Sequence, residues 1–251
     1  MALTDNIVSY WKLDESSGNA ADSAGSNTLT NTNTATYAAA LINNGGSFAS
    51  ASNQYLGIAD ASQTGLDFGT GAFSISMWMK PVALNVTYRI INKQDGTNGY
   101  GYCIIMLSDA KIRVSANSSA GAQDIPSTGT IGTTAAFTHV VFTRGATNGI
   151  RIYLNGSADT TTTNDARDVS SAEPFAIGAR VDGLDSSYNG MVDEVGVWSR
   201  ELTSAEVTSL YNGGSGLTYP FASGPANIKT WNGITAANIK TINGIPFADL
   251  V

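Results

Sequence analysis

The sequence is short of charged residues, and those it has are mostly acidic. Of its 251 residues only 13% are charged, against about 25% in an average globular protein. Acidic residues outnumber basic ones by 20 to 13, which gives a formal net charge of −7. This balance argues against nucleic acid as a partner, because phosphate binding depends on Lys and Arg. Ser, Thr, Asn and Gly make the surface polar instead, a composition typical of β-proteins.

Cysteine and histidine each occur once. The single Cys103 excludes an internal disulfide framework and a zinc site built from thiolates. It lies in an apolar run and is expected to be a small buried residue. The single His139 lies beside the apolar Val140 and Phe142, which favours a hydrogen-bonded strand residue over a member of a catalytic triad.

Long apolar runs and a signal peptide are also missing. No stretch approaches the roughly 18 consecutive apolar residues of a membrane-spanning helix. The first residues, Met1 to Asp5, lack the charged and apolar regions of a signal peptide. We therefore expect no membrane contact and no export by the usual signal-peptide route.

Most of the chain alternates between apolar and polar residues, with Gly, Asn or Asp between the alternating segments. In the run 73–80, for example, Phe73, Ile75, Met77 and Met79 share one face. The same reasoning predicts strands at 7–13, 55–58, 88–91, 100–107, 111–114, 139–143, 150–154, 175–178 and 190–198. Many short strands without interleaved helices predict an all-β fold, an antiparallel β-sandwich of the jelly-roll type.

One helix is predicted, near residues 204–211. Thr203 and Glu206 have the spacing of a capping box, and Leu202 can pack onto Val207. The helix should end near Tyr211, because an Asn-Gly pair follows it.

The composition and pattern of the sequence change after Phe221. This change divides the chain into a sandwich domain, 1–221, and a C-terminal tail, 222–251. The tail contains an 11-residue repeat, since 227–234 recurs as 238–245, and each copy carries an Asn-Gly hairpin signal. Thirty residues bury too little apolar surface to fold alone. The tail must therefore pack on the sandwich, on another subunit or on a host scaffold. The candidate assembly residues are Ile228, Trp231, Ile234, Ile239, Ile242, Ile245 and Phe247.

Five stretches of the sequence, in the expected order, resemble the laminin-G-like jelly rolls of the concanavalin A-like lectin/glucanase superfamily. They are 8–18 with 22–25, 73–81, 138–144, 152–156, and 190–198 followed by 202–207. The resemblance implies two packed antiparallel sheets, a concave face often used for ligands, and in some members a calcium ion at the rim. The tail is similar to the short Asn-Ile-Lys and Asn-Gly repeats that end some tailed-phage structural proteins.

Calcium is the cofactor that this resemblance implies. It places Asp22 and Asp193 at the ion, with Asn27 as a further candidate, and Ca²⁺ favours such carboxylate and carbonyl oxygens. The alternative is that Asp22 forms an Asx-turn and that Asp193 pairs with an arginine.

A sugar site needs an aromatic platform beside amide or carboxylate groups, because sugar rings have apolar faces and polar hydroxyls. Trp78 is the candidate platform, with Tyr88, Tyr100 and Tyr102 as its neighbours in sequence. The alternative is that Trp78 belongs to the core.

No catalytic residues are predicted. Asp193 and Glu194 are the nearest match to a glycosidase pair, but adjacent strand residues point to opposite faces of a sheet. The main hypothesis is therefore a non-enzymatic virion or surface structural protein of a bacteriophage, a homo-oligomer assembled with other subunits through its tail. The alternative is a carbohydrate-binding adhesion module, extracellular or on a bacterial cell surface, that binds glycans.

Overall fold

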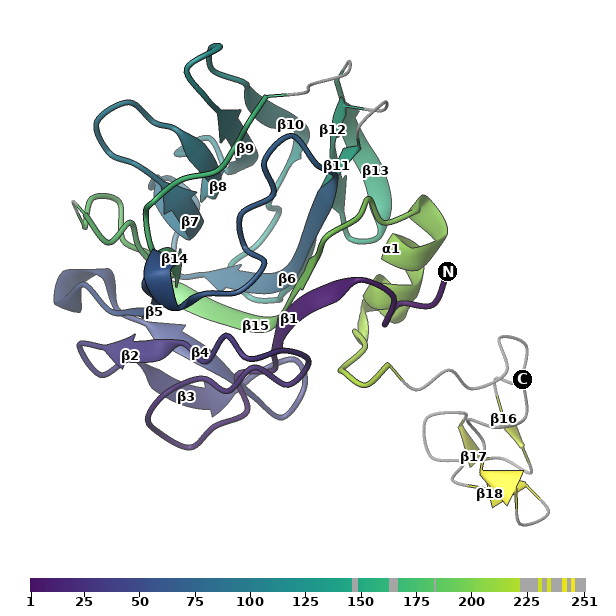
Figure 1. The fold of residues 1–251 in the computed structure, drawn as a ribbon. Helices are drawn as coiled ribbons and strands as arrows, with labels where there is room; N and C mark the ends of the chain where they lie inside the picture. The colour runs from purple at the N-terminus through teal and green to yellow at the C-terminus, as the bar shows by residue number, and fades with distance from the viewer. Residues whose placement is uncertain are drawn as a thin grey trace.

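A computed structural model describes residues 1–145, 149–162, 167–182 and 184–221, together with the backbone of four short strands in the tail. Two antiparallel sheets pack face to face as a β-sandwich (Figure 1). The all-β sandwich predicted from the sequence is confirmed.

The larger sheet has eight strands in the order β13-β12-β11-β6-β15-β4-β3, with β1 paired to β15. Their bounds are β1 Ile7–Trp11, β3 Thr36–Ala39, β4 Asn44–Phe48, β6 Phe73–Pro81, β11 Thr138–Gly145, β12 Gly149–Leu154, β13 Ser157–Thr161 and β15 Gly190–Trp198.

The smaller sheet has seven strands in the order β10-β9-β8-β7-β14-β5-β2. Their bounds are β2 Thr30–Thr32, β5 Tyr55–Ile58, β7 Tyr88–Gln94, β8 Gly101–Met106, β9 Lys111–Asn117, β10 Asp124–Thr130 and β14 Phe175–Ile177. Three 3₁₀ turns complete this part of the chain: η1 Ser50–Ser52, η2 Asp60–Ser62 and η3 Asn212–Gly214.

All ten predicted strands are present, and the prediction missed five. The missed strands, β2, β3, β4, β10 and β13, consist mostly of small or polar residues and have few large apolar ones. Four of them pair with a predicted strand, such as β4 with β15 or β10 with β9, and β3 pairs with β4 at the edge of its sheet.

The main core fills the space between the two sheets. The alternating residues Phe73, Ile75, Met77 and Met79 of β6 all point into it, as the sequence predicts, and they are fully buried. Each such side chain contributes roughly 1.5–3 kcal/mol through burial of its apolar surface. Across the sandwich, Trp11 stacks on Phe175 with ring centroids 5.1 Å apart.

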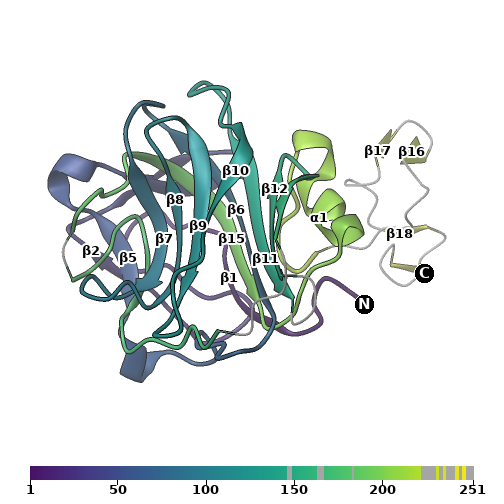
Figure 2. The ribbon, with the colours of Figure 1, turned by 90° about the horizontal axis from the view of Figure 1, so that it is seen from above.

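The helix α1, Ser204–Tyr211, lies against the outer side of the eight-stranded sheet (Figure 2). The predicted capping box is present, since the side chains of Thr203 and Glu206 each accept a hydrogen bond from the other's backbone N–H. Val207 and Leu210 pack into a second apolar cluster on this side of the sheet. No helix in the described part of the chain is long and apolar enough to cross a membrane.

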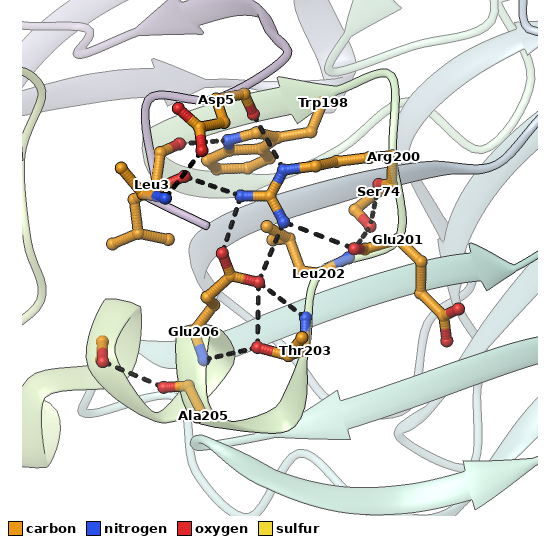
Figure 3. A network of polar contacts seen from close by, with 12 residues as sticks. Leu3, Asp5, Ser74, Trp198, Arg200, Glu201, Leu202, Thr203, Ala205 and Glu206 are labelled. Atoms are coloured by element: carbon orange, nitrogen blue, oxygen red, sulfur yellow. Dashed lines mark hydrogen bonds and ion pairs between the residues drawn. The ribbon is translucent and has the colours of Figure 1, made fainter.

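An arginine two residues beyond the end of β15 ties α1 to the N-terminus (Figure 3). The two terminal nitrogens of Arg200 donate to the carboxylate of Glu206 over 2.8 and 2.9 Å, and its Nε donates to the carbonyl of Asp5 over 2.8 Å. Trp198 Nε1 donates to the carbonyl of Leu3 over 2.7 Å. This network holds α1 in place over the sheet.

In the tail, the backbone forms the two hairpins that the Asn-Gly pairs predict. β16, Thr230–Trp231, pairs with β17, Ile234–Thr235, and β18, Thr241–Ile242, pairs with β19, Ile245–Pro246. Of the candidate assembly residues, Ile228, Ile239 and Phe247 lie outside the described residues, as do the side chains of Trp231, Ile234, Ile242 and Ile245. Assembly through the tail therefore stays a prediction.

Candidate functional site

The predicted platform residue Trp78 is covered. It lies on the outer side of the eight-stranded sheet and is only 3% exposed. Its ring stacks on His139 at 4.8 Å and on Tyr211, at the end of α1, at 5.7 Å between centroids. Nε2 of His139 is hydrogen-bonded to Ser76 Oγ at 2.9 Å, and burial lowers the pKa of the ring to about 3. His139 is thus the hydrogen-bonded strand residue that the sequence predicts, and its low pKa keeps it neutral.

The three predicted tyrosine neighbours do not join Trp78. Tyr88 and Tyr102 point into the main core between the sheets, where the hydroxyl of Tyr102 donates to the carbonyl of Leu66 over 2.9 Å. Tyr100 is 36% exposed, beyond the end of β7. The four aromatic residues therefore form no single exposed surface.

Both carboxylate oxygens of Asp22 accept hydrogen bonds from the backbone. Oδ1 accepts from the N–H groups of Tyr10, Ala24 and Gly25 over 2.8–3.0 Å, and Oδ2 accepts from that of Asn27 over 2.9 Å. This is the turn-forming role that was the alternative to calcium binding.

The other two predicted calcium ligands are held in different networks. The amide of Asn27 bonds to Ser9 Oγ and to both backbone groups of Thr64. Asp193, instead of pairing with an arginine, accepts from the N–H groups of Leu41 and Ile42 through Oδ2. In the described part of the chain no three His, Cys, Asp or Glu side chains gather as metal ligands. Calcium binding stays a prediction.

Asp22→Ala separates the two roles of this carboxylate. We expect the substitution to lower the free energy of unfolding by about 2–3 kcal/mol, because four backbone donors lose a charged acceptor. Urea unfolding should show the same loss in millimolar calcium and in chelator, with a smaller loss in Asp22→Asn. A loss confined to the calcium sample would instead support the predicted ion site.

Asp193 and Glu194 lie on the same side of the sheet, which corrects the expectation that they point to opposite faces. Asp193 pairs with Trp78 and Gly196 with Ser76, so β15 carries one extra residue here and forms a β-bulge. Glu194 takes the left-handed conformation, with φ 50°.

This acidic pair is closed off from ligands. Asp193 and Glu194 are 0% and 2% exposed. Burial raises the pKa of Asp193 to about 7 and that of Glu194 to about 8. A glycosidic bond cannot reach carboxylates that are buried in this way, so the pair does not form a glycosidase site.

The outer side of the seven-stranded sheet carries a surface that the sequence analysis missed, here called the polar face. Its residues are Arg89, Asn92, Gln94, Cys103, Arg113, Ser115, Asn117 and Asp124. A bulge at Ile90 keeps Arg89 and Asn92 on the same side, because Ile90 and Ile91 both point into the core. The polar face lies on the opposite side of the molecule from α1 (Figure 2).

Hydrogen-bonding groups cross the polar face from strand to strand. Asn92, Cys103, Ser115 and Asp124 are cross-strand partners on β7, β8, β9 and β10. The hydroxyl of Ser115 donates to Asp124 Oδ1, which also lies 3.4 Å from Asn117 Nδ2. The row sets an amide, a hydroxyl and a carboxylate side by side, with Asn92, Cys103 and Ser115 buried and Asp124 exposed.

Cys103 is buried within this row, as the sequence predicts. Its Sγ donates to Gln94 Oε1 over 3.3 Å, and burial raises the pKa of the thiol. It is therefore a packing residue and not a reactive thiolate.

An open cleft of about 630 Å³ lies at the edge of the eight-stranded sheet, where β3, β4, β6 and β15 meet. Thr36, Ser47 and Met191 line it together with Lys80, whose amine lies 5.0 Å from the centroid of the Phe137 ring. The cleft is a second place where a ligand could bind.

The family model for the concanavalin A-like lectin/glucanases superfamily matches residues 50–208. The chain belongs to this superfamily. The match runs from η1 into α1 and so includes every strand of the polar face. No curated protein matches the sequence.

Solved structures similar to this superfamily member include binding domains of other proteins. The binding domain of Paraclostridial Mosquitocidal Protein 1 has a TM-score of 0.69 at 19% identity, over 84% of this chain and 53% of that one. Domain 4 of AbnA, a GH43 extracellular arabinanase from Geobacillus stearothermophilus, was solved with arabinotriose. It has a TM-score of 0.62 at 22% identity, over 81% of this chain and 97% of that one.

A third similar structure is the binding domain of Botulinum neurotoxin DC in complex with rat synaptotagmin II. Its TM-score is 0.65 at 15% identity, over 84% of this chain and 52% of that one. The chain thus spans about half the length of the toxin domains it matches. At such low identities these similarities show the superfamily fold alone.

The polar face has a sequence signal that the search for aromatic platforms passed over. In 111–117 the residues Arg113, Ser115 and Asn117 alternate with core residues, so one side of β9 is polar throughout. In 88–94 the bulge interrupts the alternation and hides the same pattern.

Proposed function

We propose that the chain is a non-enzymatic carbohydrate-binding module that holds its ligand on the polar face. The exposed carboxylate of Asp124 carries this proposal, because it can accept hydrogen bonds from sugar hydroxyls, and the buried Ser115 and Asn117 beside it hold it in place.

The similar structures support a binding role over an assembly role. One was solved with arabinotriose, and another belongs to botulinum neurotoxin type C, whose cell entry depends on interaction with two ganglioside molecules. These favour the alternative stated from the sequence, a carbohydrate-binding module, extracellular or on the cell surface. The virion hypothesis gains no support from the comparisons and stays a prediction.

A glycan array tests the proposed site. We expect the full chain to bind at least one glycan and Asp124→Ala to weaken that binding about tenfold or more, because a charged hydrogen-bond acceptor is lost. Lys80→Ala, in the cleft of the other sheet, is the matched comparison and should bind like the unsubstituted chain. If Lys80→Ala lost glycan binding and Asp124→Ala kept it, the binding site would lie in the cleft and not on the polar face. Binding to no glycan would overturn the function.

A further inference from the structure

Two arginines of the polar face flank one apolar side chain. Arg89 on β7 and Arg113 on β9 are both in register with Ile105 on the strand between them, β8. Neighbouring strands lie about 4.8 Å apart, so the two arginines start roughly 10 Å apart and rise on either side of Ile105. All three residues lie outside the main core.

Arg113 is not neutralised within the described part of the chain. Its buried Nε has no hydrogen-bond partner there, and no described carboxylate forms an ion pair with its guanidinium. Leaving such a group unpaired costs free energy. A guanidinium in this state is suited to a partner that arrives with the ligand.

Arg89 is only loosely engaged. Its Nε lies 3.5 Å from Asp185 Oδ2, and its Nη1 lies 3.5 Å from Asn92 Oδ1 and 3.9 Å from Cys103 Sγ. Asp185 is also held by Arg180 at 3.0 Å. These contacts are long for charged groups, so the guanidinium of Arg89 still has donors to offer.

We propose that Arg89 and Arg113 bind an oxyanion of the ligand, so that the module recognises acidic sugars. Guanidinium groups form paired hydrogen bonds with carboxylate and sulfate oxygens. The inference rests on the proposed carbohydrate-binding function and specifies its ligand class.

The same surface orients the acidic sugar. The row of Arg113, Ile105 and Arg89 lies two residues along β8 and β9, and three along the bulged β7, from the row of Asp124, Ser115, Cys103 and Asn92. Asp124 would repel an anion and accepts hydrogen bonds from hydroxyls. The anionic group therefore lies at the arginine row, and the hydroxyls of the sugar lie toward Asp124.

The test uses the full chain on an array of uronate, sialylated and sulfated oligosaccharides, each beside its neutral parent. We expect at least one acidic member to bind ten or more times tighter than its neutral parent. Arg113→Gln and Arg89→Gln should each reduce this preference, and Arg113→Lys should restore part of it, because lysine keeps the charge without the paired donors. Binding of uronate or sialylated sugars would identify the recognised group as a carboxylate, and binding of sulfated sugars would identify it as a sulfate.

Arg151→Gln, on β12 of the other sheet, is the matched control and should keep the preference. Thermal melting should match the unsubstituted chain for Arg113→Gln, whose arginine has no described partner to lose. Equal binding of acidic and neutral sugars, or a preference that survives both Gln variants, would overturn the inference and leave the proposed function standing. Binding of no sugar at all would overturn both.

Discussion

Raising the pH from 5 to 8 is expected to lower the stability of the sandwich, by a net amount on the order of 4 kcal/mol. The cause is the buried pair Asp193 and Glu194, whose pKa values rise on folding to about 7 and about 8. In the unfolded chain both ionise near pH 4. Between these limits the folded protein holds protons that the unfolded chain has released, so stability falls as the pH rises and levels off above about 8.

The groups around Asp193 and Glu194 either raise the pKa values of the pair further or offset only part of the increase caused by burial. The charge of Asp14 raises both pKa values further, and the hydroxyls of Tyr10 and Thr218 lower that of Glu194 by less than burial raises it. His139 has a pKa lowered to about 3, so its burial costs stability only below about pH 6.5. Above that pH the acidic pair dominates the trend among the described groups.

Urea unfolding in chelator at several pH values measures this trend. Asp193→Asn and Glu194→Gln should each flatten the fall in stability between pH 5 and 8, since neither amide ionises. Asp5→Asn serves as the matched control, because Asp5 lies in the exposed N-terminal turn and should leave the slope unchanged. A chain that is equally stable at pH 5 and 8, or more stable at pH 8, would show that the pair is ionised and compensated in the folded state.

The strands and the helix were predictable because each is specified locally. The alternation of Phe73, Ile75, Met77 and Met79 lies within one strand, and the capping box of α1 lies within four residues. These patterns act through the backbone period of two and through hydrogen bonds between near neighbours.

The candidate site was not predictable in the same way. It depends on β-bulges and on side chains that are covered by residues far away in the sequence. One extra residue in β15 places Asp193 and Glu194 on the same side, and another in β7 places Arg89 and Asn92 together. The bulge in β7 has no glycine, and Gly196 lies just after the bulge in β15 without showing where the extra residue falls. Trp78 is covered by Tyr211, which is far away in the chain. A period of two assigns faces correctly only until the first bulge.

The second large effect is expected for Lys93→Met, which should lower the free energy of unfolding by about 3–5 kcal/mol. The side chain of Lys93 is fully buried at the end of β7. Its Nζ lies 2.6 Å from Asp60 Oδ1 and 3.0 Å from Asp67 Oδ1, and it donates to the carbonyls of Ser171 and Glu173. One ammonium thus ties two separate loops to the seven-stranded sheet.

Methionine has a similar length and supplies no donor, so the loss measures the polar contacts and not a cavity. Asp60 and Asp67 keep about a third of their side-chain surface in solvent and can be hydrated, but the two carbonyls lose a donor at a buried site. Lys80→Met, at a half-buried lysine of β6, is the matched control and should change the stability by less than about 1 kcal/mol. Equal urea midpoints for Lys93→Met and the unsubstituted chain would mean that desolvation of the ammonium already cancels its contacts.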